Sequence, residues 1–338
     1  MIGLFRGIQS AGYSPVKPES NHCIAMFHKK VECRDCKAVC KADAIKIGRP
    51  GTGISVDSSK CTGCEKCISA CSYGAFKRSG MSEKKWCDSI IDSLDNGELF
   101  IKCKAVKAKN TKAVNCVGSI HAVHILYWLT KGIKKIVFKF GDCSSCNHSD
   151  GVNCLIEQLD SLDNFVSSLD KCFVERCCDE DGIVLSASGF AERSASARLK
   201  NQVLGRRDFF KTVGREFAIG MNDITDAFTV KENSAVDFNV KNELSQRVAL
   251  FRETFSSIKH LIRRDIRFDR KIPLCSLNID KEKCSGCGIC IKLCPTGALK
   301  ESAGGGFNHN PFYCHGCGVC VKACMSGCIS VDDKISVR

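Results

Sequence analysis

The sequence repeats the spacing Cys-x2-Cys-x2-Cys-x3-Cys three times. Three cysteines two residues apart lie on one tight loop and can hold three corners of a cubane 4Fe-4S cluster, while the fourth points to a neighbouring cluster. Structural zinc is the alternative, but it would leave the third and fourth cysteines of each run without a role. The pattern therefore predicts iron-sulfur clusters and one-electron transfer. The three runs are Cys61, Cys64, Cys67 and Cys71; Cys284, Cys287, Cys290 and Cys294; and Cys314, Cys317, Cys320 and Cys324.

Cysteine accounts for 27 of the 338 residues. Its clustering in short runs, without a signal peptide over residues 1–20, argues against a secreted disulfide framework. A reducing, anaerobic cytoplasm is the expected location. Since no stretch reaches the roughly 18 apolar residues of a membrane-spanning helix, we expect a soluble protein of two or three domains with no transmembrane segment.

The formal net charge is +13 when cysteine is counted as neutral. A 4Fe-4S core with four thiolates carries about −2, so four such clusters would leave about 13 − 8 = +5. Two basic stretches could steer an acidic soluble redox carrier toward the chain, although a solvated face is the alternative. They contain Lys102, Lys104, Lys107, Lys109 and Lys112, and Arg263, Arg264, Arg267 and Arg270.

An internal repeat joins the two ends of the chain, because residues 56–76 align without gaps on residues 279–299. Each copy resembles half of a bacterial two-cluster ferredoxin, in which short strands and helices wrap two cubanes around a pseudo-two-fold axis. In the carboxyl-terminal module, residues 271–338, the exchange of fourth ligands implies two clusters. Cluster 3 would be held by Cys284, Cys287, Cys290 and Cys324, and cluster 4 by Cys314, Cys317, Cys320 and Cys294. Cys328 falls outside the motif and is interpreted as a small apolar filler or a spectator.

The amino-terminal module, residues 1–80, departs from the pattern at its first motif, where Lys30 stands in place of a cysteine. The nearest upstream cysteine is Cys23, and the loop that follows it could return it to the same cluster. His22 or His28 could replace Cys23 as the ligand. We predict cluster 1 at Cys23, Cys33, Cys36 and Cys71, and cluster 2 at Cys61, Cys64, Cys67 and Cys40.

Residues 81–175 show alternating helix and strand patterns that predict a small open α/β sheet domain. Ligands gather beyond the carboxyl ends of the strands in such a sheet. Cys103, Cys116, Cys143 and Cys146 all occupy that edge and could form a fifth centre, either [2Fe-2S] or [4Fe-4S], with zinc as the less favoured alternative. The predicted helices are 82–95, 119–131 and 152–169, and the predicted strands are 99–101, 113–115 and 135–140.

This middle stretch resembles the small iron-sulfur subunit, delta, of methyl-viologen-reducing hydrogenases over about 60 residues. That family links heterodisulfide reductase to a hydrogenase or a formate dehydrogenase, so the resemblance implies an electron-carrying role. The shared features are residues 114–118, a helix with Ile125 and Leu129, Gly132, the strand 136–138 and a loop from Cys146 to Gly151.

Residues 176–270 are poor in proline and predict a helical linker, with helical spacing at 194–204 and 242–262. The run 206–211 resembles a twin-arginine export motif, but its internal position favours an ordinary helix start. The adjacent Cys177 and Cys178 could join Cys172 or Cys154 in another metal site.

The sequence as a whole predicts an α+β and α/β multidomain chain with the function of a polyferredoxin-type electron-transfer subunit. Because no dinucleotide fingerprint or phosphate loop is present, a partner would do the chemistry: a hydrogenase, a formate or aldehyde oxidoreductase, or a heterodisulfide-reductase-like complex. One alternative is an enzyme with an open site in the middle domain beside His121, His124 or His148. The other is a redox-sensing regulator, although the basic linker carries no recognised nucleic-acid motif.

Overall fold

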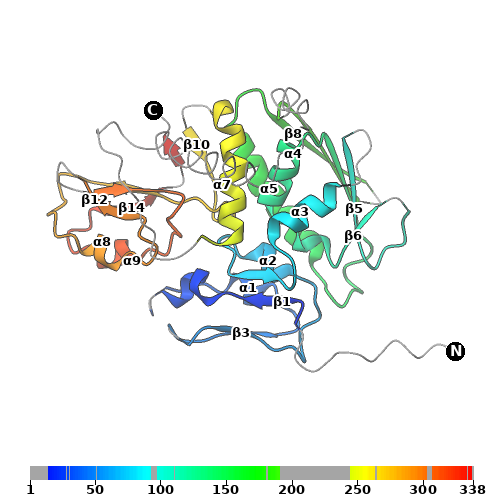
Figure 1. The fold of residues 1–338 in the computed structure, drawn as a ribbon, viewed down its shortest axis with the longest axis horizontal. Coiled ribbons are helices and arrows are strands. Elements are labelled where there is room, and N and C mark those ends of the chain that lie inside the picture. Colours follow the sequence, from blue (N-terminus) through cyan, green and yellow to red (C-terminus); the bar gives the residue numbers. More distant parts are fainter. Residues whose placement is uncertain are drawn as a thin grey trace, which may run out of the picture.

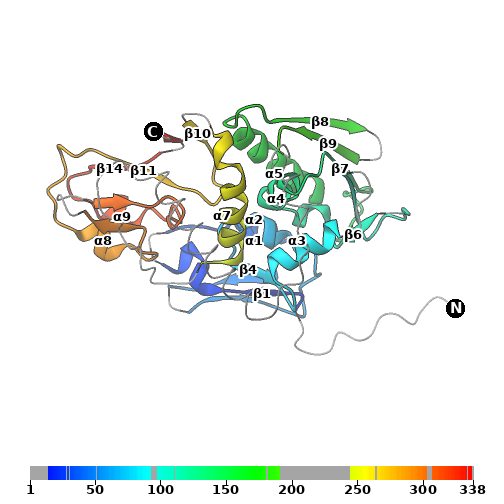
Figure 2. The same ribbon diagram turned by 45° about the horizontal axis from the view of Figure 1, so that its top comes forward.

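The computed structural model describes residues 14–190 and 244–336, apart from residues 28, 30, 51, 93–96, 110, 180–181, 263–264, 303–306 and 333. Figure 1 shows the amino-terminal module in blue, a middle domain in cyan and green, and the carboxyl-terminal module in orange and red. Helix α7 (Gln246–Ile258) stands between the middle domain and the carboxyl-terminal module in this view and in the turned view (Figure 2).

The amino-terminal module consists of antiparallel strand pairs and short helices around a small apolar core that includes Ile68 and Phe76. Its first strand pairs with its last, with Val16 opposite Arg78, and the two strands between them form a hairpin. The elements are β1 (Val16–Pro18), η1 (Ser20–His22), η2 (Ile24–Met26), α1 (Asp35–Ala38), β2 (Ile45–Ile47), β3 (Ile54–Val56), α2 (Lys66–Ala70) and β4 (Phe76–Arg78).

The carboxyl-terminal module repeats this pairing, with its first strand against its last and a hairpin between them. Its elements are β11 (Ser276–Ile279), α8 (Ile289–Leu293), β12 (Leu299–Glu301), β13 (Phe307–His309), α9 (Val319–Ala323) and β14 (Ile329–Asp332). A further pair, β10 (Asp265–Arg267) with β15 (Lys334–Ser336), ties the last described residues to the segment before the module. The common topology agrees with the internal repeat found in the sequence.

A five-stranded mixed sheet, in the order β6-β5-β7-β9-β8, forms the middle domain. Strands β5, β6 and β7 are parallel, so their carboxyl ends lie at one edge of the sheet, where ligands are expected. Strand β9 pairs with β7, and β8 with β9, in antiparallel fashion. The predicted strands and helices of this domain are present with small shifts at their ends. They are α3 (Glu83–Ile91), β5 (Glu98–Cys103), β6 (Lys112–Val114), η3 (Val117–Ser119), α4 (Ala122–Thr130), β7 (Lys135–Lys139) and α5 (Gly151–Val166).

The predicted helical linker of 176–270 is wrong for its first part, which is a β-hairpin. Strand β8 (Phe173–Asp179) crosses the expected domain boundary, and β9 (Gly182–Ser188) returns beside β7. The alternation of buried Ile183 and Leu185 with less buried neighbours suits a strand on a sheet face. Helix α7, continued by η5 (Lys259–Leu261), agrees with the helix predicted at 242–262. The predictions at 194–204 and 206–211 lie outside the described residues.

One apolar core runs from the middle domain through α7 into the carboxyl-terminal module. Phe165 of α5 packs on Phe251 of α7 with ring centroids 5.9 Å apart, and Phe255 packs on Phe312 at 5.1 Å. Because burial of aromatic side chains dominates core energetics, α7 is a structural member of the middle domain as well as a connection. No helix of the described ranges is long and apolar enough to cross a membrane.

Candidate metal centres

Three cavities coincide with three of the four predicted clusters. The largest, about 220 Å³, lies between the start of α8 and the loop that follows α9 in the carboxyl-terminal module. Each cavity is lined by all four cysteines of one predicted set, so these thiols converge on a shared space, as a cubane requires. The sets are Cys284, Cys287, Cys290 and Cys324 for cluster 3; Cys40, Cys61, Cys64 and Cys67 for cluster 2; and Cys294, Cys314, Cys317 and Cys320 for cluster 4.

The thiols of cluster 1 also lie together. Burial raises the pKa of Cys36, and the neighbouring sulfurs of Cys71, Cys23 and Cys33 raise it further. Cys23 lies between η1 and η2, is 8 % exposed, and has its sulfur near that of Cys36. His22, the alternative ligand, instead has its Nε2 atom 3.9 Å from Oε2 of Glu19. His28 is outside the described residues.

The cysteine loops depend on left-handed backbone at one recurring position. Gly63, Gly286 and Gly316 each precede the second cysteine of their run and have φ values of 72°, 68° and 58°. Glycine adopts this region without steric cost, so it allows the chain to fold its cysteines onto one side of a tight loop. The short helices α2, α8 and α9 then carry the third cysteine of each run inward.

Backbone amides approach the sulfurs at the fourth position of two runs. The N–H of Ala44 donates to Sγ of Cys40 at 3.4 Å, and the N–H of Ala75 donates to Sγ of Cys71 at 3.2 Å. Hydrogen bonds to the sulfurs are one of the factors that set the potential of a cluster. The chain therefore supplies both ligands and donors at these positions.

The four middle-domain cysteines meet at the carboxyl edge of the parallel strands. The thiols of Cys103, at the end of β5, and Cys116, just after β6, are hydrogen-bonded to each other, which lowers the pKa of Cys103 and raises that of Cys116. Cys143 and Cys146 lie near Cys103 and raise its pKa. Within the described ranges, no three His, Cys, Asp or Glu side chains are close enough to share a single metal ion. An iron-sulfur cluster is larger than one ion, so its ligands stand farther apart.

Two glycines explain part of this geometry. A Cβ atom on Gly151, at the start of α5, would overlap Sγ of Cys116, and one on Gly118 would lie 2.6 Å from the carbonyl oxygen of Gly151. The backbone of η3 therefore packs directly on the first turn of α5, with the Cys116 sulfur beside it.

The edge that carries these cysteines is docked against α2 of the amino-terminal module. The ammonium group of Lys66, a side chain 1 % exposed, donates to the carbonyl oxygens of His148 and Ser149 at 2.5 and 2.6 Å. Burial raises the pKa of Cys64, and the nearby Cys116 sulfur raises it further. Cluster 2 and the middle-domain cysteines are therefore adjacent.

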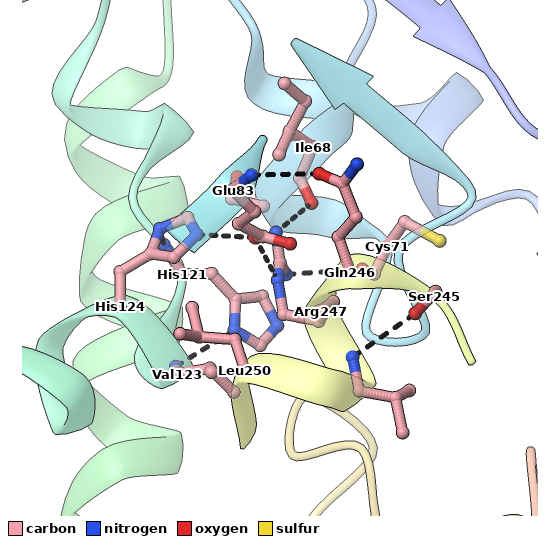
Figure 3. A network of polar contacts seen from close by, with 12 residues as sticks. Ile68, Cys71, Glu83, His121, Val123, His124, Ser245, Gln246, Arg247 and Leu250 are labelled. Carbon is pink, nitrogen blue, oxygen red and sulfur yellow. Dashed lines mark hydrogen bonds and ion pairs between the residues drawn. The ribbon is translucent and has the colours of Figure 1, made fainter. Parts of the chain in front are cut away.

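A buried ionic network fastens α7 to the same helix (Figure 3). Arg247, which is 0 % exposed, forms an ion pair with Glu83 of α3 and donates to the carbonyl oxygens of Ile68 and Cys71 at 3.2 and 3.4 Å. Nε2 of His124 lies 2.6 Å from Oε1 of Glu83. Burial raises the pKa of Glu83, but Arg247 and His124 outweigh it and lower the pKa to about 2.

This network corrects one prediction made from the sequence. The alternative of an open enzymatic site in the middle domain would put His121 or His124 beside the cysteines there. Instead they cap α4, where Nδ1 of His121 accepts from the N–H of Val123 at 3.0 Å and Nδ1 of His124 accepts from the N–H of His121 at 3.1 Å. Only His148 belongs to the cysteine loop, where its N–H donates to Sγ of Cys146 at 3.4 Å.

The two ferredoxin-like modules touch through an aromatic contact. Tyr73, two residues after Cys71, stacks on His315, the residue after Cys314, with ring centroids 4.6 Å apart. Phe27 stacks on the same imidazole at 5.6 Å. Burial lowers the pKa of His315 to about 3, so the ring is neutral at physiological pH. This contact lies between the predicted ligands of clusters 1 and 4.

Several cysteines outside the motifs occupy unexpected places. Cys275 is hydrogen-bonded to Cys314. The Sγ atoms of Cys328 and Cys324 are 3.4 Å apart. Cys154 on α5 is near Cys116. Cys177 and Cys178 are exposed on β8, and the structure places Cys154 with Cys116 rather than with them. Motif spacing does not indicate these neighbours, since each of them depends on a contact between separate elements.

Comparison with known protein families identifies both terminal modules. Residues 31–75 and residues 276–325 each match a family described as a 4Fe-4S dicluster domain. Neither match reaches the middle domain, and no curated protein matches the chain. The thiol-lined cavities fit the group that the family implies. The chain therefore contains two iron-sulfur electron-transfer domains that together carry four [4Fe-4S] clusters.

Proposed function

We propose that this chain is a polyferredoxin-type electron-transfer subunit that relays electrons between a catalytic oxidoreductase and a second redox carrier. The clusters supply reversible one-electron chemistry when bound, and the chain sets their order and separation. The proposed partner classes are the hydrogenases, the formate or aldehyde oxidoreductases and the heterodisulfide-reductase-like complexes, and the middle-domain resemblance favours all of these except the aldehyde oxidoreductases.

Contacts between ligand sets support a linear order of centres. Cys64 of cluster 2 is near Cys116 of the middle domain, and Cys36 of cluster 1 raises the pKa of Cys67 of cluster 2, after burial and Cys64. In the carboxyl-terminal module, burial raises the pKa of Cys320 of cluster 4 to about 12, with smaller contributions from neighbours that include Cys290 of cluster 3. The proposed order is therefore the middle-domain centre, then clusters 2, 1, 4 and 3.

The observation that carries this proposal is the position of Tyr73 between the modules. Burial raises its pKa well above the usual value, and the sulfurs of Cys275, Cys314, Cys317 and Cys71 add to the shift. Its neighbours thus include cysteines assigned to both cluster 1 and cluster 4. A buried contact between two dicluster domains supports one continuous path, whereas two independent carriers would need no shared interior.

We propose the middle-domain cysteines as a fifth iron-sulfur centre, either [2Fe-2S] or [4Fe-4S], at one end of the relay. The N–H of Val117 donates to Sγ of Cys103 at 3.3 Å, which is the kind of bond that iron-sulfur sites use. The other end is cluster 3, where Cys287 is exposed. A partner could reach each end without crossing the other centres.

An anaerobic purification of the tagged, cluster-loaded chain from its native host tests this function. We expect a catalytic oxidoreductase subunit to co-purify in fixed ratio, and the substrate of that enzyme to bleach the cluster absorbance. Recovery of the chain alone with its clusters intact would contradict the subunit role. If the substrate bleaches the clusters only after an acidic carrier is added, the carrier delivers electrons from the enzyme to the chain. That result would contradict the proposed direct contact between the enzyme and the chain.

A further inference from the structure

The four cysteine runs differ at the residue that lies four positions after the last cysteine. This residue is alanine in three runs, at Ala44, Ala75 and Ala298, and cysteine in the fourth, at Cys328. In the first two runs the amide at this position donates to the sulfur of the fourth ligand. The position is therefore in contact with a ligand sulfur, and only the last run puts a thiol there.

Cys328 is buried, 5 % exposed, and lines the cavity of about 220 Å³ together with all four predicted ligands of cluster 3. Its Sγ atom lies 3.4 Å from Sγ of Cys324. The Cys324 sulfur also lies 3.4 Å from Oγ of Ser326, and the backbone N–H groups of Ser326 and Cys328 are hydrogen-bonded to it. No other fourth-position sulfur among the described residues has a cysteine thiol at this place.

The spacing decides which of the two sulfurs binds iron. Cys324 follows Cys320 by four positions, as Cys71 follows Cys67, so it is the ligand. A sulfur bound to iron has lost its proton and can only accept a hydrogen bond. Cys328 must then be the donor in the contact between the two.

We propose that Cys328 donates an S–H···S hydrogen bond to the ligand sulfur of Cys324 and thereby raises the reduction potential of cluster 3. Reduction of the bound cluster would add one electron from the neighbouring centre and change the charge from about −2 to about −3. No bond is broken, and the proton stays on Cys328. Because a hydrogen bond to a more negative sulfur is stronger, the donor stabilises the reduced form more than the oxidised form.

In the proposed relay, this effect favours the arrival of electrons at the exposed end of the chain. That consequence rests on the proposed order of centres. The hydrogen bond itself rests only on the ligand assignment of cluster 3. The test below uses the isolated full chain and no partner, so it can fail or succeed independently of the proposed function.

The experiment is an anaerobic potentiometric titration of the full, cluster-loaded chain, followed by electron paramagnetic resonance. The signal of cluster 3 is first identified as the one that changes in C287S. We compare the wild type with C328A, which reproduces the residue of the other three runs, and with C328S, which keeps a hydroxyl donor. C87A is the matched control, because Cys87 is a buried cysteine of α3 that is 0 % exposed and outside every proposed ligand set.

We expect C328A to lower the equilibrium constant for reduction of cluster 3 by roughly tenfold, about 59 mV for one electron, with iron content unchanged. C328S should lower the reduction potential of cluster 3 by less than half as much as C328A does. C87A should leave this potential unchanged. A potential unchanged in C328A would overturn the proposal, as would the same shift in C87A. Loss of cluster 3 iron in C328A would identify Cys328 as a ligand and also overturn it.

Discussion

Arg247 of α7 and Glu83 of α3 form an ion pair in the interior, with side chains that are 0 % and 7 % exposed. The same guanidinium group reaches the carbonyl oxygens at the end of α2, one of which belongs to Cys71, a predicted ligand of cluster 1 (Figure 3). A buried pair contributes little net stability over apolar groups, but removing one partner leaves an uncompensated charge. The pair therefore fixes how three separate elements meet.

Replacement of Arg247 by Met should cost about 3–5 kcal/mol of unfolding free energy, because Glu83 would remain buried without its arginine, with only His124 beside it. The double variant E83Q/R247M should recover a large part of this loss. The matched control is K84M, which breaks the exposed pair of Lys84 with Glu253, 2.6 Å apart, and should cost only about 0–1 kcal/mol. Anaerobic denaturant unfolding measures all three. Equal losses for R247M and K84M would show that the buried pair has no special role.

Replacement of Tyr73 by Ala should slow the exchange of electrons between the two dicluster modules without loss of iron. It removes the ring that stacks on His315, and the stack alone is worth about 0.5–1.5 kcal/mol beyond its buried area. Y73F is the control, since it keeps the ring and loses only the hydroxyl group, which donates to the carbonyl oxygen of Leu274 at 3.4 Å. Rapid-mixing reduction followed by freeze-quench spectroscopy gives the rates. A path that avoids this contact predicts the same rate in both variants.

Replacement of Gly151 by Ala should displace the Cys116 sulfur, because the new Cβ atom would occupy its place. We expect the chain to lose the iron of the middle-domain centre and keep that of the four ferredoxin-type clusters. G141A is the control: a Cβ atom there would meet only Cγ2 of Val106, at an ordinary distance of 3.8 Å. Iron and sulfide analysis of the purified chains distinguishes them. Full iron content in G151A would argue against Cys116 as a ligand.

Replacement of Cys23 by Ser should lower the iron content by about one cluster. Of the four predicted ligands of cluster 1, Cys23 is the one that lies outside the repeated cysteine spacing. H22Q is the control, because His22 lies beside Glu19 and is not expected to bind iron. Loss of the cluster in H22Q but not in C23S would reverse the assignment.

Stability should fall as the pH is lowered from about 6.5 to 4. Burial lowers the pKa of His124 from the usual 6.5 to about 4, so the unfolded chain binds this proton before the folded chain does. Glu83 acts in the same direction at lower pH, because its pKa of about 2 lies below the usual 4.5. Each group contributes at most about 1.4 kcal/mol per pH unit. Unfolding midpoints of the wild type and H124Q, measured from pH 7.5 to 5, should show the smaller slope in H124Q; identical slopes would contradict this.

Local rules account for the parts of the structure that the sequence predicts well. The cysteine runs are short loops with glycine at a left-handed position, as at Gly286, and each forms where its spacing indicates. The parallel strands of the middle domain follow from apolar segments such as Ile136 to Phe138, and their ends bring Cys103 and Cys116 together. These features depend on residues within one element or between adjacent elements.

Contacts between distant segments could not be predicted in this way. Strand β9 is fixed by pairing with β7, and β8 by pairing with β9, whereas the low proline content and helical spacing of residues 176–270 predict a helical linker. Tyr73 and His315 meet although 242 positions separate them, and nothing in either local sequence indicates the other. The sequence predicts Cys328 to be a filler or a spectator, because its contact with the sulfur of Cys324 appears only in three dimensions.

The separation of 176 positions between Cys71 and Arg247 has a consequence for synthesis of the protein. At about 5–20 residues per second, a ribosome needs roughly 10–35 s to add α7 after it has completed the first module. During this interval the cysteines of clusters 1 and 2 are made but lack the helix that later covers one side of them. The first module is therefore complete for this interval before α7 exists, whereas the second module is finished only after that helix.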